Sequence, residues 1–163
     1  MEALINEVVL DVIDQPPPDR TAGIPAASTA AFRSLWRREP NIQGGVLGKY
    51  QAALDAVNKA RDTEARKPFK DAKLVVHLRN HFMPFKPEWQ DVDAEHHFER
   101  TLKRAKMVEN QQPVRAPWFP NKALGAGLAD WSCDITTRFA NSWWKRIGVR
   151  GRFDTSFNQL LPP

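Results

Sequence analysis

The stretch that decides the fold is residues 121–148, NKALGAGLADWSCDITTRFANSWWKRIG, near the end of the chain. Gly148 follows this stretch's last apolar residue, at the position where a helix C-terminus favours glycine. The spacing predicts a long amphipathic helix over 121–147, because apolar residues three or four positions apart share one side of a helix. Its apolar stripe consists of Leu124, Leu128, Trp131, Ile135, Phe139, Trp143 and Ile147.

The same period recurs upstream and predicts further helices. They are expected over 2–14, from Pro25 to the Glu39-Pro40 pair, over 46–61, over 69–83 and over 93–107. Proline-rich connections separate several of them, and residues 15–25 are expected to be a linker or surface loop. Strand signals are nearly absent. We therefore predict an all-α fold, a helical bundle with Pro-rich connecting loops, as a single domain over 1–149 with a basic, flexible tail over 150–163.

Composition excludes several classes of protein. Hydrophobic residues make up 42% and charged residues 26% of the 163 positions, as in globular rather than disordered chains. The formal net charge of +5 permits an acidic partner such as RNA. No apolar run reaches the length of a membrane span, so no membrane partner is expected. The single cysteine, Cys133, excludes an internal disulfide, favours a cytoplasmic location, and is expected to be a small core residue.

Two adjacent residues, Arg79 and Asn80, are the first candidates for a binding site. They lie on the side of the 69–83 helix opposite Val75 and Leu78. An arginine there can bind a phosphate with two N–H groups, and an asparagine can orient a base edge or a water. The alternative is structural: Arg79 pairs with a carboxylate, and Asn80 bonds a carbonyl freed near the proline that follows.

Metal and cofactor chemistry are not expected. His77 and His81 have the i, i+4 spacing of helical zinc ligands, but no HExxH pattern accompanies them. His96 and His97, being adjacent, face different directions on a helix. The chain also lacks a glycine-rich phosphate loop. We therefore predict no metal site, no cofactor and no confident catalytic residue.

Basic clusters offer further contacts for an RNA. The cluster at Lys145 and Arg146, continued by the basic tail, is the best of them, because a mobile basic segment can follow a phosphate backbone. The other clusters are expected to be solvated surfaces, including the Arg37-Arg38 pair. Trp36 fits a core stripe, and packing is favoured for it over base stacking.

Three sequence patches carry a resemblance to a known family. They are residues 2–7 (EALINE), residues 78–89 (LRNHFMPFKPEW) and residues 119–125 (FPNKALG) with the helix that follows. On these patches the chain resembles the uncharacterised bacterial proteins of the HEPN-like class. The resemblance covers residues 1 to about 149, and its central patch is the specific one. It implies an α-helical bundle.

The resemblance also implies a site. In HEPN ribonucleases an arginine, often with a polar residue after it, and a histidine four to six residues further on form a composite site across a homodimer. On that pattern Arg79 stabilises phosphate charge, Asn80 supports it, and Lys86 in the same patch contacts RNA. The histidine position falls on Pro84. Proline can neither give nor take a proton, so the general acid–base part of the mechanism is absent there.

These observations predict a non-catalytic or weakened HEPN-like module that binds RNA or a partner protein. A homodimer and a cognate antitoxin are its expected partners, in a defence or toxin–antitoxin setting. Two alternatives stay open at this point. One is a structural or interaction bundle with no nucleic-acid role, and the other is a metal-independent ribonuclease that uses another histidine.

Overall fold

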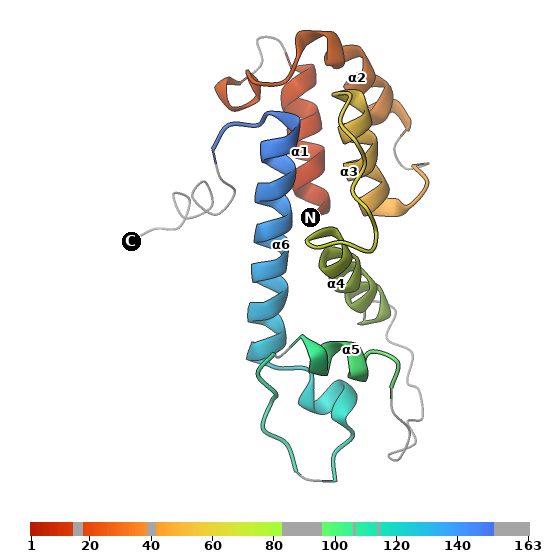
Figure 1. The fold of residues 1–163 in the computed structure, drawn as a ribbon, viewed down its shortest axis with the longest axis vertical. Coiled ribbons are helices and arrows are strands. Elements are labelled where there is room, and N and C mark those ends of the chain that lie inside the picture. Colours follow the sequence, from red (N-terminus) through yellow and green to blue (C-terminus); the bar gives the residue numbers. More distant parts are fainter. Residues whose placement is uncertain (15–17, 39–41, 83–95, 106, 114, 152–163) are drawn as a thin grey trace. The chain divides into compact units, whose positions relative to one another are not determined.

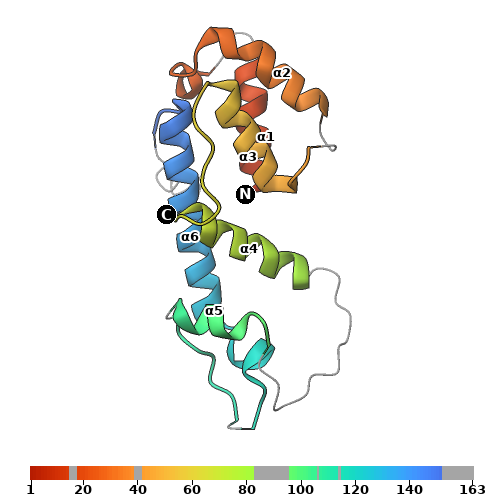
Figure 2. The same cartoon turned by 45° about the vertical axis from the view of Figure 1, so that its right-hand side comes forward.

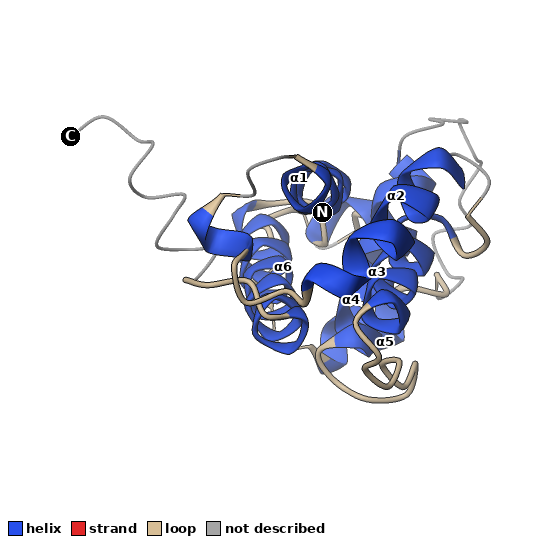
Figure 3. Cartoon of the chain, turned by 90° about the horizontal axis from the view of Figure 1, so that it is seen from above, coloured by secondary structure: helices blue, strands red, loops and turns tan. Residues whose placement is uncertain are grey.

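The computed structural model of the chain is all-helical, as the sequence predicts. It describes residues 1–14, 18–38, 42–82, 96–105, 107–113 and 115–151. Within these ranges the regular secondary structure consists of helices and contains no strand (Figure 3). No helix of the described residues is both long enough and apolar enough to cross a bilayer.

The described residues divide into two compact units, each packed mainly within itself. Unit 1 takes its residues from Met1–Lys73 and Thr136–Pro163, and unit 2 from Leu74–Ile135. Two helices, α4 (Phe69–Phe82) and α6 (Ala126–Ile147), supply residues to both units. The prediction of a single domain over 1–149 stays a prediction.

Unit 1 is built on three helices that contact one another. They are α1 (Glu2–Ile13), α2 (Thr29–Arg38) and α3 (Gly45–Ala56) (Figures 1 and 2). Two short helical turns, η1 (Asp19–Thr21) and η2 (Ala26–Ser28), connect α1 to α2. The segment expected to be a linker is thus partly structured, because the Arg20 guanidinium binds the carboxylates of Glu7 and Asp11 on α1.

An aromatic cluster forms the centre of unit 1. The ring of Tyr50 on α3 lies edge-on to Phe139 and Trp143 of α6, with centroids 4.9 Å and 4.7 Å away. The Trp143 indole N–H donates to the Tyr50 carbonyl at 3.2 Å, and the Tyr50 hydroxyl donates to the Met1 carbonyl at 2.7 Å. All three rings are nearly inaccessible to solvent. Burial raises the pKa of Tyr50 above its ordinary value, since the phenolate loses its hydration.

Unit 2 has its own apolar core. It is formed by parts of α4 and α6 together with α5 (Glu99–Arg104) and the short turn η3 (Trp118–Lys122). Its buried members are Leu78, Phe98, Leu102, Phe119, Ala123 and Leu128. Partly buried apolar side chains cover them, namely Leu74, Phe82, Met107, Trp118 and Trp131.

Three helices are shorter than the sequence predicts. α3 ends at Ala56 instead of residue 61, because Asn58 adopts a positive φ of 55°. The Lys59 amide then bonds the Leu54 carbonyl at 2.9 Å and closes the helix in a Schellman-type turn. α5 spans six residues instead of fifteen, and α6 begins at Ala126 because η3 precedes it.

Three residues expected in the core lie at the surface. Trp36 is 37% exposed and Leu124 is 42% exposed, and Cys133 on α6 is exposed as well. Leu124 precedes α6, so the stripe of that helix does not include it. Trp36 and Cys133 are spaced as the apolar residues of their helices are, but they lie at or beyond the edge of the buried side. The width of that side depends on the neighbouring helices.

Candidate functional site

Arg79 and Asn80 lie in the last turn of α4, in unit 2. The neighbouring Leu78 is buried in the unit 2 core, so α4 presents the next two residues to solvent. The Arg79 Nη1 donates to the Asn80 Oδ1 at 3.0 Å. This bond orders the two side chains as a pair while both remain exposed.

The structural alternative for this pair is not seen in the described part of the chain. There the Arg79 guanidinium donates to Asn80, and no described carboxylate binds it. A guanidinium in this state can bind a phosphate without first breaking an ion pair.

Two residues of the predicted motif, Pro84 and Lys86, lie outside the described residues. Lys86 as an RNA contact and Pro84 as the replacement for a histidine therefore remain predictions from the sequence.

Histidines that are distant in sequence gather in unit 2. The His81 ring centroid lies 5.3 Å from that of His96 and 5.8 Å from that of His97, and the last two are 4.2 Å apart. The His96 ring also stacks on Phe119 at 4.0 Å. The Phe98 backbone N–H donates to the His96 Nδ1 at 3.3 Å, so this nitrogen is the unprotonated one. Sequence spacing had paired His77 with His81 instead, and His77 is exposed.

The histidine cluster does not form a metal site. Among the residues that the structure describes, no group of three or more His, Cys, Asp or Glu side chains is arranged to hold a metal ion.

The second predicted pair, Lys145 and Arg146, lies in the last turn of α6, in unit 1. Lys145 is exposed. Arg146 already has structural partners, because its guanidinium donates to the Asp62 carboxylate and to the Ala60 carbonyl. It anchors the segment after α3 to α6, so Lys145 is the member of the pair whose ammonium faces solvent.

A buried lysine is a feature that the sequence reasoning missed. Lys49 on α3 is 7% exposed, and its ammonium donates to Glu2 Oε1 at 3.0 Å and to Asn6 Oδ1 at 3.4 Å. Glu2 and Asn6 are one turn apart on α1, and both belong to the first patch of the family resemblance. Their i, i+4 spacing indicates that the two polar side chains share one side of α1. It does not identify Lys49 as their partner, because Lys49 is more than forty residues away in sequence.

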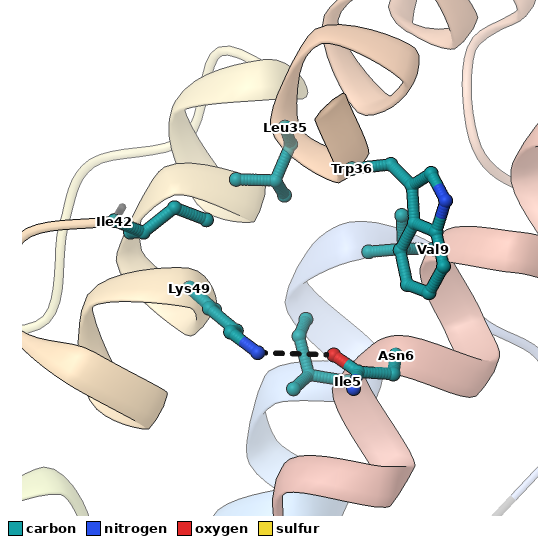
Figure 4. A pocket seen from close by; sticks show the side chains of 7 residues that line it. All are labelled: Ile5, Asn6, Val9, Leu35, Trp36, Ile42 and Lys49. Atoms are coloured by element: carbon teal, nitrogen blue, oxygen red, sulfur yellow. Dashed lines mark hydrogen bonds between the residues drawn. The ribbon is translucent and has the colours of Figure 1, made fainter. Parts of the chain in front are cut away.

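The Lys49 side chain also borders a small pocket in unit 1 (Figure 4). The pocket is mostly apolar, and the Lys49 ammonium and the Asn6 amide meet at one end of it, with Trp36 and Val9 also in its lining. Its lining is completed by Ile5, Leu35 and Ile42.

Comparisons with protein-family models, with curated proteins and with solved structures find no match to this chain.

Proposed function

We propose that this chain is a non-catalytic or weakened HEPN-like module that binds RNA, with Arg79 as its central phosphate contact. The observation that supports the proposal is the exposed Arg79–Asn80 pair, whose guanidinium binds no described carboxylate. The sequence adds the motif around the pair, and the net charge of +5 favours a polyanionic ligand.

The geometry of the pair suggests different roles for Arg79 and Asn80. Asn80 accepts one N–H of Arg79 and so limits the orientations of the guanidinium. A guanidinium held in this way loses less conformational entropy when it binds a phosphate oxygen. The motif position occupied by Pro84 supplies no proton, so the proposed outcome of RNA contact is binding rather than cleavage.

A direct test measures RNA affinity as a function of salt. Purified protein is titrated into a labelled RNA of mixed sequence, and the dissociation constant is followed between about 50 and 200 mM salt. We expect Arg79→Ala to weaken binding and to reduce the salt slope by about 0.7–0.9, the value for one phosphate contact. Asn80→Ala should weaken binding less, because it removes an orienting contact only.

Arg104 provides the matched control. It is also an exposed arginine in the last turn of a helix of unit 2. Arg104→Ala should leave the affinity nearly unchanged. Equal losses in the two variants would show that general charge, not the Arg79 site, binds the RNA. Absence of binding at low salt would overturn the RNA proposal and favour a protein-interaction or structural role.

A second candidate function, a metal-independent ribonuclease, is favoured by one observation. The His81, His96 and His97 imidazoles gather in the same unit as Arg79. The test is RNA cleavage in the presence of a chelator. A true activity is lost in Arg79→Ala and in at least one of the three histidine variants, whereas cleavage that persists in Arg79→Ala indicates a contaminating nuclease.

The family resemblance also proposes a homodimer, because the composite site of HEPN ribonucleases needs two chains. Light scattering coupled to size-exclusion chromatography measures the mass directly. A dimer supports the HEPN-like assignment, and a strict monomer counts against both candidate functions in their HEPN form. A cognate antitoxin would be the partner protein in the same setting.

A further inference from the structure

One face of α2 combines an exposed aromatic ring with two arginines. Arg33, Trp36 and Arg37 occupy positions i, i+3 and i+4, which lie next to one another on a helix, and all three are exposed. Phe32 and Leu35, on the adjoining side of α2, are 0% and 4% exposed. The helix is thus anchored by its apolar side and presents the arginine–tryptophan face to solvent.

The Trp36 ring is held in place although it is exposed. It borders the pocket of unit 1, which Val9 of α1 and Leu35 of its own helix also line (Figure 4). With 37% of its surface open to water, it still has area for a flat apolar partner. A ring that packing has already positioned loses little conformational entropy on stacking.

Within the part of the chain that the structure describes, the two arginines of this face form no ion pair. α2 carries no acidic residue from Thr29 to Arg38. Within the described residues, no carboxylate binds the guanidinium of Arg33 or Arg37. Other arginines of unit 1 do find such partners: Arg20 binds Glu7 and Asp11, Arg61 binds Asp55, and Arg146 binds Asp62.

From these contacts we propose that Arg33, Trp36 and Arg37 form a second RNA-contacting surface, one that takes single-stranded RNA. An unpaired base stacks on Trp36 while the two guanidiniums bind the phosphates on either side of it. The ligand class rests on the proposed function, but the residues and the unit are different. Single strands fit this surface because a duplex keeps its bases stacked on one another, out of reach of a side-chain platform.

A membrane surface fits the same face less well. An interfacial helix buries a broad apolar face in the lipid. On α2 the apolar residues Phe32 and Leu35 are already buried in unit 1, which leaves Trp36 as the exposed aromatic residue. One ring and a few arginines match a base and its phosphates better than they match a bilayer.

The experiment compares a labelled 12-nucleotide single-stranded RNA with an RNA hairpin of similar length, by fluorescence anisotropy at several salt concentrations. Trp36→Ala should weaken single-strand binding about tenfold, equal to about 1.4 kcal/mol. The salt slope should stay the same in this variant, because no charge changes. Hairpin binding should change by less than about twofold.

Variants of the two arginines, unlike Trp36→Ala, should change the salt dependence of binding. The double variant Arg33→Gln/Arg37→Gln should reduce the salt slope for single strands by about 1.4, since each phosphate contact on a single strand contributes about 0.7. Two controls in unit 2 match these changes: Leu124→Ala removes an exposed apolar side chain, and Arg115→Gln removes an exposed charge. Both controls should leave binding unchanged.

Trp36 also packs on its neighbours, so a second measurement separates binding from folding. Trp36→Phe keeps an aromatic ring at the edge of the pocket and should retain part of the single-strand affinity. In addition, single-stranded RNA should protect the wild-type fluorescence from acrylamide quenching, and this protection should be smaller in Trp36→Phe.

Defined outcomes overturn the proposal. They are unchanged affinity in folded Trp36→Ala, equal losses for single strand and hairpin, or binding to phosphatidylserine vesicles that depends on Trp36 while RNA binding does not. The two proposals fail separately. Loss of affinity in the α2 variants with none in Arg79→Ala supports the α2 surface and refutes the Arg79 site, and the reverse result does the opposite.

Discussion

The close approach of two glycines at the end of α6 gives the sharpest test of the packing in unit 1. A Cβ placed on Gly148 would lie 2.5 Å from the Gly23 carbonyl oxygen, and one placed on Gly23 would lie 2.3 Å from the Gly148 carbonyl oxygen. Both distances are far below an ordinary van der Waals contact. The neighbouring atoms are backbone, and hydrogen bonds hold them, including the 2.7 Å bond from the Arg150 amide to the Arg20 carbonyl. An alanine at either position must therefore push two ordered segments apart.

Three glycines allow the cost of a left-handed backbone to be separated from the cost of a steric overlap. Gly148 has a φ of 92° and also makes the close contact, Gly151 has a φ of 89° with no atom within 4 Å, and Gly23 makes the contact alone. Gly151→Ala should cost at most about 1 kcal/mol, because left-handed strain of about 1–2 kcal/mol is partly offset by a stiffer unfolded chain. Gly23→Ala should cost about 1–3 kcal/mol through overpacking. Gly148→Ala combines both effects and should cost about 2–4 kcal/mol.

Urea unfolding followed by circular dichroism measures these free energies. For a chain of this size Gly148→Ala should lower Tm by about 5–15 °C. The double variant Gly23→Ala/Gly148→Ala should cost less than the sum of the single variants, because the first Cβ already separates the two segments. Equal destabilisation by Gly148→Ala and Gly151→Ala would refute the reasoning, since only the first of them has a close contact.

Three further predictions concern side chains. Tyr50 is the only tyrosine, so absorbance at high pH reports its ionisation alone, and its pKa should lie above the ordinary value. The free energy of unfolding should therefore fall as pH rises above about 10. Tyr50→Phe loses the hydrogen bond to the Met1 carbonyl, so it should cost about 1 kcal/mol and remove that pH dependence. Arg146→Met should destabilise unit 1 by about 1–2 kcal/mol in urea, because methionine keeps the packing of the side chain. Asp62→Ala should destabilise it much more, because the Arg146 guanidinium then loses its carboxylate and keeps only the Ala60 carbonyl. Cys133, being exposed, should react with a thiol reagent in the native protein nearly as fast as in urea, and a native thiol that is strongly protected would contradict its placement.

Local sequence signals predicted much of the helical architecture. The bounds of α1 and α4 agree with the sequence within one residue, because their apolar period and flanking residues act over short distances. The cap of α6 was also predicted: Gly148 has a positive φ, and the amides of Gly148 and Val149 both bond the Trp144 carbonyl at 3.0 Å. The end of α3 was missed, because a left-handed conformation is less common for Asn58 than for a glycine.

The sequence also predicted one part of the candidate site, and the rest of it needed the three-dimensional structure. The sequence predicted that Arg79 and Asn80 lie away from the apolar side of α4, and in the structure both are exposed while Leu78 is buried. The bond between the two side chains and the lack of a described carboxylate partner needed coordinates. The grouping of His81 with His96 and His97 also needed the three-dimensional structure, because no helical period in the sequence relates these positions.

The sequence by itself determined the helical class, the bounds of α1 and α4 and the glycine cap of α6, since these depend on contacts within a few residues. Tertiary structure decided which partners the charged residues have. Lys49 binds Glu2 and Arg146 binds Asp62 across 47 and 84 positions, and no local pattern encodes such pairings. It also decided that Trp36 faces solvent, because the width of a buried helix face depends on the helices packed against it.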